Sequence, residues 1–219
     1  APREQLQEVY VSESFLEKCS CREHLEEVGY EVVSDSVFSK ISDTCTPQGV
    51  LCVLKQFHYN IEEMLRDKAP LFLLLENIQD PGNLGTMLRT GEGAGVSGII
   101  MSRDTVDLYN PKVIRSTMGS IYRVPFYYVD DFAAAGHQVQ QAGVSVYAAH
   151  LRGKNSYACQ DYTKGTAFLI GNEGNGLREE TAELADCYIR IPMEGKVESL
   201  NAAVASSILM YEAHRQRAI

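Results

Sequence analysis

Residues 168–178 read F-L-I-G-N-E-G-N-G-L-R, and residues 189–201 read I-R-I-P-M-E-G-K-V-E-S-L-N. In each stretch a short apolar run, ending at Ile170 or Ile191, leads directly into a glycine-bearing loop. In α/β proteins, the loops beyond the carboxyl ends of the strands form the ligand crevice. We therefore expect these two loops, about twenty residues apart, to be two walls of one pocket.

The chain around these loops alternates between strand-like and helix-like segments from Leu71 onward. Leu71–Leu75 is a continuous apolar run, which is typical of a parallel strand buried on both faces. Strands are expected at 71–75, 98–101, 124–128, 144–148, 167–170 and 188–191. Helices are expected at 84–94, 111–118, 131–142, 179–185 and 200–215. This alternation predicts an α/β fold, with a parallel sheet covered by helices on both faces.

The segment before this alternation reads as a separate, smaller unit. Residues 1–57 mix strand-like and helix-like runs without a catalytic constellation, which favours a role in recognition or support. Residues 58–70 are polar, end at Pro70 and are expected to form a linker to a main domain at 71–219. The polar N-terminus lacks both an initiating Met and the apolar core of a signal peptide, so we expect N-terminal residues to be missing.

The composition is that of a folded, non-membrane protein. Of the 219 residues, 45% are hydrophobic, and no apolar run reaches the length of about eighteen residues needed to cross a membrane. The net charge of −9 by itself argues against nucleic-acid binding, because phosphate contact needs local Lys and Arg. However, Arg103, Lys112, Arg115 and Arg123 fall within 21 residues, so the chain can still carry a basic surface.

The six cysteines form no C-x-x-C pair and have no histidine at zinc-finger spacing, so no metal site is expected. Cys19 and Cys21 leave a metal or redox pair open, although C-S-C spacing suits neither well. Cys52 and Cys187 lie in apolar, strand-like runs and are expected to be buried. Reduced structural thiols in a cytoplasmic protein are the favoured interpretation.

The loop after the first main-domain strand carries polar side chains that a simple turn does not require. Asp80-Pro81-Gly82 forms a turn, and Asn83 is expected to cap the next helix with its side-chain oxygen. Arg89 follows one to two helical turns later, close to the same loop. An Asn and an Arg gathered at the end of a strand favour a functional site over a purely structural turn.

The run Gly93–Gly98 fits the G-x-G-x-x-G dinucleotide fingerprint but stands in the wrong context. The fingerprint leaves a strand and opens a helix, whereas this run follows a helix and enters a strand. It is expected to be a helix C-cap and a tight connection, which excludes a nicotinamide or flavin cofactor at this position.

Residues 110–125 form the stretch best suited to RNA phosphate. Asn110 and Pro111 predict a helix start, and Lys112 and Arg115 lie three apart on one helical face. Ser116 and Arg123 add donors near the helix end, and Tyr122 adds a stacking surface. A solvated basic face is the structural alternative.

The two glycine loops each carry one or two groups that could contact a ligand. Three glycines in Gly171–Gly176 let the backbone turn sharply and approach a ligand closely. Glu173, which lies among them, is either a surface turn residue or a polar group that contacts the ligand or the neighbouring Arg. In the second loop Ser199 is expected to be the N-cap of the last helix, with free N–H groups suited to an anion. Capping by Ser199 leaves Asn201 unexplained.

Three segments together resemble, in order and spacing, the three motifs of SpoU (TrmH-type) RNA ribose methyltransferases of the SPOUT class. They are N-I-Q-D-P-G-N-L-G-T-M-L-R-T at 77–90, L-I-G-N-E-G-N-G-L at 169–177 and I-P-M-E-G-K-V-E-S-L-N-A-A-V-A at 191–205. The similarity spans about residues 70–215. The module at 1–57 is similar, more distantly, to a shortened form of that family's RNA-substrate-binding domain.

The resemblance implies a C-terminal deep trefoil knot, a feature that no pattern of periodicity predicts. It further implies a cytoplasmic enzyme that transfers methyl from S-adenosylmethionine to a ribose 2′-hydroxyl in structured RNA, ribosomal rather than transfer RNA. The implied partners are the RNA and a second copy of the chain, in a homodimer whose active site draws on both chains. No membrane and no metal are implied.

The family's functional residues map onto matching positions of this sequence. The implied catalytic residues are Asn83, Arg89, Glu173, Ser199 and Asn201. The implied cofactor-binding residues are Ala149, Leu151, Gly153, Gly171, Gly176, Ile191, Met193 and Leu200. RNA binding is expected from Arg89, Lys112, Arg115, Ser116 and Arg123. In the family the residue at the position of Arg89 is proposed as the general base, but a guanidinium with a pKa above 12 is almost never neutral, so a clamp on phosphate or alkoxide stays open.

Two other functions are compatible with the resemblance. A non-catalytic RNA-binding member could keep the fold and lose turnover, but all five catalytic-type residues are present, which favours the enzyme. Methylation of a base, as in more distant knotted relatives, is disfavoured by the N-x-x-D-P-x-N opening at 77–83.

Overall fold

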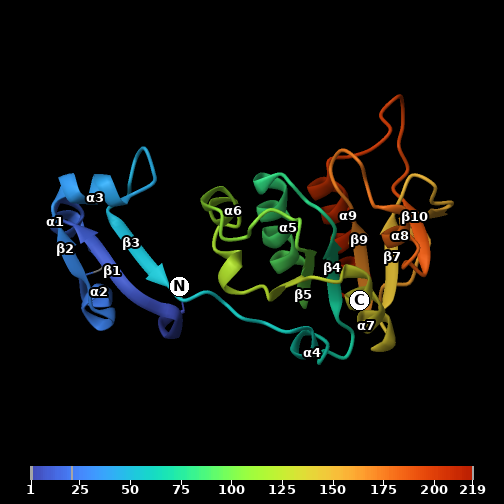
Figure 1. The fold of residues 1–219 in the computed structure, drawn as a ribbon, viewed down its shortest axis with the longest axis horizontal. Helices are drawn as coiled ribbons and strands as arrows, with labels where there is room; N and C mark the ends of the chain where they lie inside the picture. The colour runs from blue at the N-terminus through green and yellow to red at the C-terminus, as the bar shows by residue number, and fades with distance from the viewer. Residues whose placement is uncertain (1, 21, 219) are drawn as a thin grey trace. The chain divides into compact units, whose positions relative to one another are not determined.

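The structure is a computed structural model that describes residues 2–20 and 22–218, and it contains two compact units. The first unit, Ala1–His58, is built on a three-stranded sheet with strand order β2-β1-β3 (Figure 1). Strand β1 pairs parallel with β2 and antiparallel with β3. The elements are η1 (Arg3–Gln5), β1 (Leu6–Ser12), α1 (Glu13–Lys18), α2 (Arg22–Val28), β2 (Glu31–Val33), α3 (Asp35–Ile41) and β3 (Val50–Leu54).

A small apolar core holds the first unit together. Val9 and Val11 of β1 pack with Leu25 of α2. Cys52 was expected to be buried, and this prediction is wrong: its side chain in β3 is exposed. Cys21 lies outside the described residues, so the structure does not test the proposed pairing of Cys19 with Cys21.

The second unit, Tyr59–Ile219, contains a seven-stranded sheet among its described residues, and every strand pairing in it is parallel. Its strand order is β6-β5-β4-β9-β7-β10-β8. The strands are β4 (Leu71–Leu75), β5 (Gly98–Ser102), β6 (Phe126–Val129), β7 (Ser145–Ala149), β8 (Asn155–Ser156), β9 (Thr166–Ile170) and β10 (Cys187–Arg190). The helices are α4 (Ile61–Met64), α5 (Pro81–Ala94), α6 (Pro111–Ser116), η2 (Ser120–Tyr122), α7 (Phe132–Gln141), η3 (Tyr157–Cys159), α8 (Glu179–Ala182) and α9 (Ala202–Arg217).

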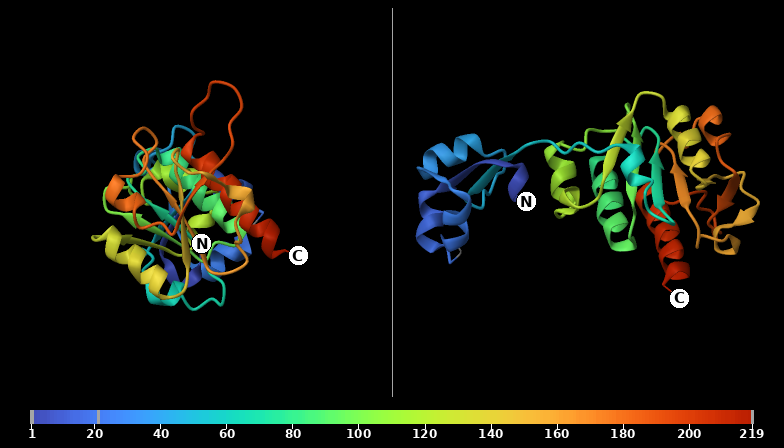
Figure 2. Two further views of the ribbon diagram at one scale, coloured as in Figure 1. Left: turned by 90° about the vertical axis from the view of Figure 1, so that its right-hand side faces the viewer. Right: turned by 90° about the horizontal axis from the view of Figure 1, so that it is seen from below.

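The strand order brings the sequence-distant glycine loop beside the loop after β4. Strand β9 inserts between β4 and β7, so that Leu75 of β4 pairs with Ile170 of β9, directly before both loops. All five residues of β4, β5 and β9 are buried, as expected for central parallel strands. Helices α5 and α9 lie side by side on one face of the sheet, and α4 and α7 cover the other (Figure 2). The predicted α/β fold with helices on both faces is confirmed.

Residues expected to form the linker take part in the second unit. Ile61 and Met64 of α4 are buried in the core with Phe72 and Val139, so residues 59–70 pack as part of this unit. Strand β8 was not foreseen, because two residues carry no periodicity. Among the described residues, no helix is long and apolar enough to cross a membrane.

Two helix starts differ from the prediction because another residue is the N-cap. Helix α5 begins at Pro81 rather than Leu84, since the Asp80 side chain accepts a hydrogen bond from the Asn83 N–H at 2.8 Å. Helix α9 begins at Ala202, and its N-cap is Asn201 rather than Ser199. The predicted C-cap of α5 is confirmed at Gly95, whose φ of 78° is left-handed.

Candidate active site

Asn83 lies at the centre of a polar network that joins three loops. Because Asp80 caps α5, the Asn83 amide is free to make other contacts, and its Nδ2 donates to Glu173 Oε1 at 3.0 Å. Its Oδ1 accepts a hydrogen bond from Asn201 Nδ2 at 2.9 Å. One residue from each of the three sequence motifs therefore meets here, across 90 and 118 positions of sequence.

The orientation of each amide in this network is fixed by its neighbours. Asn201 Oδ1 caps α9 by accepting from the N–H groups of Ala203 at 2.9 Å and Val204 at 3.2 Å, so its Nδ2 must point to Asn83. Asn83 Oδ1 receives that proton, and its own Nδ2 must therefore point to the Glu173 carboxylate. The chain of donors leaves one N–H and one lone pair on Asn83 for a further ligand.

Glu173 is held as a carboxylate by three donors. Besides Asn83, the backbone N–H groups of Gln79 and Asp80 each donate to its carboxylate at 3.0 Å. Burial acts to raise the pKa of Glu173, but the hydrogen bonds from Asn83, Gln79 and Asp80 outweigh it, and the pKa is lowered. Glu173 is therefore charged at neutral pH and unsuited to donate a proton.

The glycine loop of residues 171–178 closes back on itself. Asn172 and Gly176 exchange two backbone hydrogen bonds, of 3.1 and 2.9 Å, and Asn172 Oδ1 accepts from the N–H groups of Gly174 and Asn175 at 3.0 Å each. A Cβ on Gly171 would lie 2.2 Å from the backbone nitrogen of Leu177. Only glycine fits at position 171, because a side chain there would occupy the space of the returning chain.

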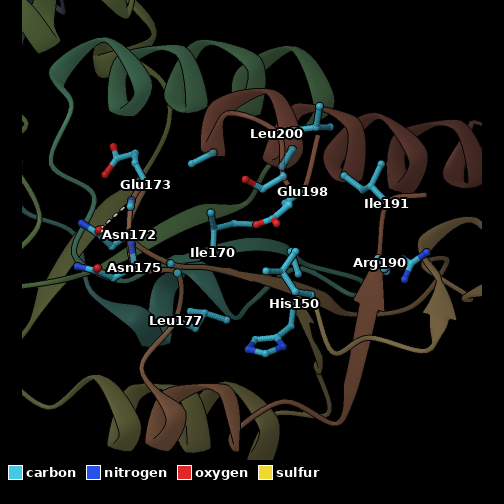
Figure 3. Close-up of a pocket in the computed structure, with 18 of the residues that line it drawn as sticks. His150, Ile170, Asn172, Glu173, Asn175, Leu177, Arg190, Ile191, Glu198 and Leu200 are labelled. Carbon is cyan, nitrogen blue, oxygen red and sulfur yellow. Dashed lines mark hydrogen bonds between the residues drawn. The ribbon is translucent and has the colours of Figure 1, made fainter. Parts of the chain in front are cut away.

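A cavity of about 460 Å³ lies between the two glycine-bearing loops and the end of β7 (Figure 3). Asn172 and Glu173 lie at one end of it and Arg190 at the other, and aliphatic side chains form much of the wall between them. The cavity is within the size range of small-molecule sites. Of the expected cofactor-binding residues, it is lined by Ala149, Leu151, Gly171, Gly176, Ile191, Met193 and Leu200.

Gly153 is the expected cofactor-binding residue that does not line this cavity. It lies under β10 instead, where a Cβ would be 2.8 Å from the carbonyl carbon and oxygen of Ile189. The Gly153 N–H donates to the His150 carbonyl at 2.9 Å, and the Ile189 carbonyl in turn accepts from the His150 N–H at 3.1 Å. Gly153 thus permits a close backbone crossing behind the pocket wall.

A second, polar hollow adjoins the cavity. It is lined by four of the five expected catalytic residues, namely Asn83, Glu173, Ser199 and Asn201. Glu173 and Ser199 also line the first cavity, so the two spaces share a wall. A molecule in the glycine-walled cavity would therefore lie next to one in the polar hollow, which is the arrangement that group transfer requires.

Arg89 does not line the polar hollow with these four residues. It is on the exposed face of α5, lines neither hollow, and has no ion pair within the part of the chain that the structure describes. The role of Arg89 at this site stays a prediction.

The expected RNA-binding residues divide into exposed and engaged side chains. Lys112 and Arg115 of α6 are exposed, and Arg115 Nε donates to the Pro111 carbonyl at 3.2 Å. Arg123 is paired with Glu92 of α5. Ser116 Oγ donates to the Val113 carbonyl at 2.8 Å and to the Pro81 carbonyl at 3.2 Å, so it joins α6 to α5.

Several residues at the site were not predicted from the sequence. Asn172 lies in the predicted glycine loop, and its Nδ2 donates to the Asn77 carbonyl at 2.8 Å, which joins this loop to the loop after β4. His150 lines the cavity and stacks on Tyr188, with ring centroids 5.2 Å apart. Burial lowers the pKa of His150, helped by the charge of Arg152 and opposed by Glu179, so the ring is neutral at pH 7.

No metal-binding group of three His, Cys, Asp or Glu occurs among residues 2–20 and 22–218.

The model of the SpoU rRNA methylase family matches residues 70–211. The chain belongs to this family. Its SpoU relatives include the 23S rRNA (guanosine(2553)-2′-O)-methyltransferase RlmP of Bacillus subtilis, 36% identical over 186 residues that cover 82% of this chain and 70% of RlmP. The 23S rRNA (guanosine-2′-O-)-methyltransferase RlmB of Bordetella pertussis is 33% identical over 222 residues, covering 98% of this chain and 91% of RlmB.

Solved SpoU structures share the fold. The SpoU methyltransferase AviRb from Streptomyces viridochromogenes, in complex with the cofactor AdoMet, matches 97% of this chain and 83% of its own with a TM-score of 0.86 and 27% identity. The AdoMet-bound rRNA methyltransferase from Sinorhizobium meliloti matches 96% of this chain and 80% of its own, with a TM-score of 0.81 and 32% identity. The predicted family is confirmed, and the trefoil knot stays a prediction.

Proposed function

We propose that this chain transfers the methyl group of S-adenosylmethionine to a ribose 2′-hydroxyl of structured RNA, and that its substrate is ribosomal RNA. The observation that carries the proposal is the shared wall of Glu173 and Ser199 between a glycine-walled cavity and a hollow lined by Asn83 and Asn201. The named functions of RlmP and RlmB, both of which act on 23S rRNA, support the same reaction.

The cavity fits the chemistry of the cofactor. Gly171 leaves no room for a Cβ, so the backbone itself forms the wall, and aliphatic residues such as Ile170 and Leu177 offer an apolar surface to an adenine ring. The carboxylate of Glu198, a residue that lines the cavity, suits a ligand that carries a cationic sulfonium and an ammonium group. When bound there, S-adenosylmethionine supplies an electrophilic methyl group, whose carbon–sulfur bond breaks as the ribose oxygen bonds to the methyl carbon.

The residues of the chain have to hold the ribose, and the proton of its 2′-hydroxyl passes to solvent water as the oxygen bonds to the methyl carbon. Asn83 has one N–H and one lone pair free, so it can both donate to and accept from a ribose. Ser199 lies on the shared wall, so its hydroxyl is available to orient the 2′-oxygen. Because Glu173 is bonded to three donors and has a lowered pKa, its role is to fix Asn83 in place. Positioning of this kind can supply a large share of the rate enhancement.

Arg89 completes the site from a second copy of the chain in this proposal. Its guanidinium is exposed, lacks an ion pair in the described chain, and stands on the same helix pair, α5 and α9, as the exposed apolar side chains Val204 and Tyr211, which are 48% and 49% exposed. A homodimer formed through these helices would cover the apolar side chains and bring Arg89 to the partner's hollow.

Substituting Arg89 tests the site. Arg89→Ala is expected to abolish methyl transfer to RNA while the dissociation constant for S-adenosylmethionine stays near the wild-type value, since Arg89 does not line the cofactor cavity. Unchanged turnover in Arg89→Ala would refute its role. Loss of cofactor binding together with turnover would refute the separation of the two spaces.

Mixing two inactive variants tests the dimer. If each site takes Arg89 from one chain and Glu173 from the other, an equal mixture of Arg89→Ala and Glu173→Gln regains one intact site in every mixed dimer. Activity should then return to about one quarter of wild type, because about half of the dimers are mixed. A mixture as inactive as its components would show that one chain supplies the whole site.

The remaining parts of the proposal concern the RNA and the place of action. Lys112 and Arg115 are the exposed cations proposed to contact phosphate. Residues 1–57 are proposed to contribute to substrate recognition, as the resemblance to an RNA-substrate-binding domain suggests. The reaction on ribosomal RNA is proposed to take place in the cytoplasm.

A further inference from the structure

Glu76 is a buried carboxylate at the end of β4 that belongs to none of the three motifs. It directly follows Leu75 and is only 1% exposed. A carboxylate removed from water is tolerated where charged and hydrogen-bonding partners surround it, and removing such a partner is costly. The position of its partners therefore indicates what Glu76 does.

The side-chain partners of Glu76 all come from the chain that leaves the glycine loop. Its Oε2 accepts from the Arg178 N–H at 2.9 Å, and its Oε1 accepts a short hydrogen bond from Thr181 Oγ1. The Arg178 guanidinium lies 3.5 Å from Oε1 and also pairs with Asp104 in the loop after β5. Glu76 thus fastens residues 178–181 to the end of β4.

The other limb of the glycine loop is fastened to the same loop after β4. Asn172 Nδ2 donates to the carbonyl of Asn77, the residue next to Glu76, at 2.8 Å. Asn77 itself has a φ of 55°, a left-handed value uncommon outside glycine, and its N–H donates to Ser102 Oγ at 2.8 Å. Asn77 therefore binds the limb that precedes the tip of the glycine loop, and the adjacent Glu76 binds the limb that follows the tip.

Between these anchors the loop presents the groups of the candidate active site. Glu173 at its tip bonds to Asn83, and Leu177 returns so close to Gly171 that no Cβ would fit between them. If residues 178–181 were released, the returning limb could lift from Gly171, and both the cavity wall and the Glu173 carboxylate would shift.

We propose that Glu76 is a positioning residue for methyl transfer: it holds the C-terminal limb of the glycine loop, through Arg178 and Thr181, so that Glu173 meets Asn83 and the cofactor wall stays closed. The inference rests on the proposed function of this site. It adds a residue outside the three motifs that acts on the reaction through the loop.

Glu76→Gln tests the inference with little change of shape. A glutamine offers one acceptor oxygen and a donor NH₂ in place of two acceptors, so it cannot accept from both the Arg178 N–H and Thr181. We expect kcat to fall by about 10- to 100-fold, the loss that an ångström of misplacement produces, with the KM for RNA unchanged. The dissociation constant for S-adenosylhomocysteine, measured calorimetrically without RNA, should rise by about tenfold.

A matched control removes a carboxylate from the same limb without touching the anchor. Glu179 pairs with Arg152 at 3.3 Å on the surface, with its side chain 75% exposed. Glu179→Gln should keep kcat and cofactor affinity within about twofold of wild type, because exposed ion pairs contribute little. Equal losses in Glu76→Gln and Glu179→Gln would overturn the assignment to Glu76.

A double-mutant cycle separates positioning from a general effect on stability. If Glu76 acts through Glu173, then adding Glu76→Gln to Glu173→Gln should raise the dissociation constant for S-adenosylhomocysteine much less than it does in wild type. Fully additive losses would overturn the proposal. Should Glu76→Gln fail to fold, Thr181→Val removes one partner at a smaller cost and should show the same pattern with smaller losses; wild-type kinetics in Thr181→Val would then overturn it.

The wild-type protein measured in parallel distinguishes the two proposals. Wild type that binds S-adenosylhomocysteine but methylates no RNA would refute the proposed function. The change in the dissociation constant for S-adenosylhomocysteine in Glu76→Gln would then still test whether Glu76 holds the glycine loop. Wild type that methylates RNA, next to a Glu76→Gln variant equal to it in kcat and in affinity, would refute the role of Glu76 alone.

Discussion

Replacing Gly171 by alanine perturbs the cofactor cavity at its tightest point. The added Cβ would lie 2.2 Å from the Leu177 nitrogen, 2.3 Å from the Gly176 carbonyl carbon and 2.5 Å from the Gly176 oxygen. The shortest of these is 1.2 Å below the 3.4 Å of an ordinary contact. All three atoms are backbone, so no side-chain rotation relieves the overlap and the loop itself has to move.

The expected loss follows from the cost of overpacking. Forcing extra atoms into a packed site costs about 1–3 kcal/mol. The free protein can relieve the overlap by opening the loop, so the cost is expressed when the loop closes on its ligand. At about 1.4 kcal/mol per tenfold change, the dissociation constant for S-adenosylmethionine should rise by about 5- to 150-fold.

Gly174→Ala is the matched control for this measurement, because it lies in the same loop. A Cβ there would meet a single neighbour, Asn172 Oδ1, at an ordinary 3.6 Å. Isothermal titration calorimetry with S-adenosylmethionine should therefore show a large loss of affinity for Gly171→Ala and retention of most of it for Gly174→Ala. Wild-type affinity in Gly171→Ala, or equal losses in both variants, would refute the structural reasoning.

Three further predictions concern packing, pH and salt. Gly85→Ala should lower the free energy of unfolding by about 1–3 kcal/mol in denaturant titrations, because its Cβ would lie 1.7 Å from the hydroxyl oxygen of Ser116 in α6. Gly93→Ala should cost less, because its Cβ would meet only the hydroxyl end of the exposed Tyr211 side chain, at 2.9 Å. A larger loss for Gly93→Ala than for Gly85→Ala would contradict the packing of α5. The lowered pKa of Glu173 stabilises the fold above its unfolded-state pKa of about 4.3, so the melting-temperature gap between wild type and Glu173→Gln should be present at pH 7 and shrink as the pH falls below about 4; a gap independent of pH would argue against the charged network. Replacing Lys112 or Arg115 by alanine should reduce the slope of log K for RNA against log salt by about 0.7–0.9 each, and an unchanged slope would exclude that side chain from phosphate contact.

The sequence located the pocket because the strands that lead into it are distinct. Leu71–Leu75 and Ala167–Ile170 are apolar at every position, and they became β4 and β9 with every residue buried. The pairing of β4 with β9 could not be predicted from the sequence, because strand order depends on contacts between distant segments and β9 lies between β4 and β7. The resemblance, rather than periodicity, connected Asn83 with Glu173 and Asn201.

The helix N-caps show that local propensity alone does not determine which residue caps a helix. Asp80 and Asn83, and likewise Ser199 and Asn201, are all competent caps within one turn of each other. Asp80 caps α5, and the Asn83 amide bonds instead to Glu173 and Asn201, which are 90 and 118 residues away. Such choices are made by tertiary contacts that no local window contains.

Glu76 and Cys52 mark the limits of reading burial from sequence. Glu76 is an acidic residue yet only 1% exposed, because partners 102 and 105 residues away surround its side chain. Cys52 lies in an apolar strand yet is exposed in a three-stranded sheet. For Glu76 the neighbours that decide its burial are remote in the chain.

The position of the transferred methyl group tests the central claim most directly. Unmodified ribosomal RNA would be incubated with the protein and S-adenosylmethionine carrying a deuterated methyl group, digested to nucleosides and analysed by mass spectrometry. The proposed function predicts labelled 2′-O-methylated nucleoside, and its absence when Arg89→Ala replaces wild type. Label on a base, or no label in any nucleoside, would contradict it.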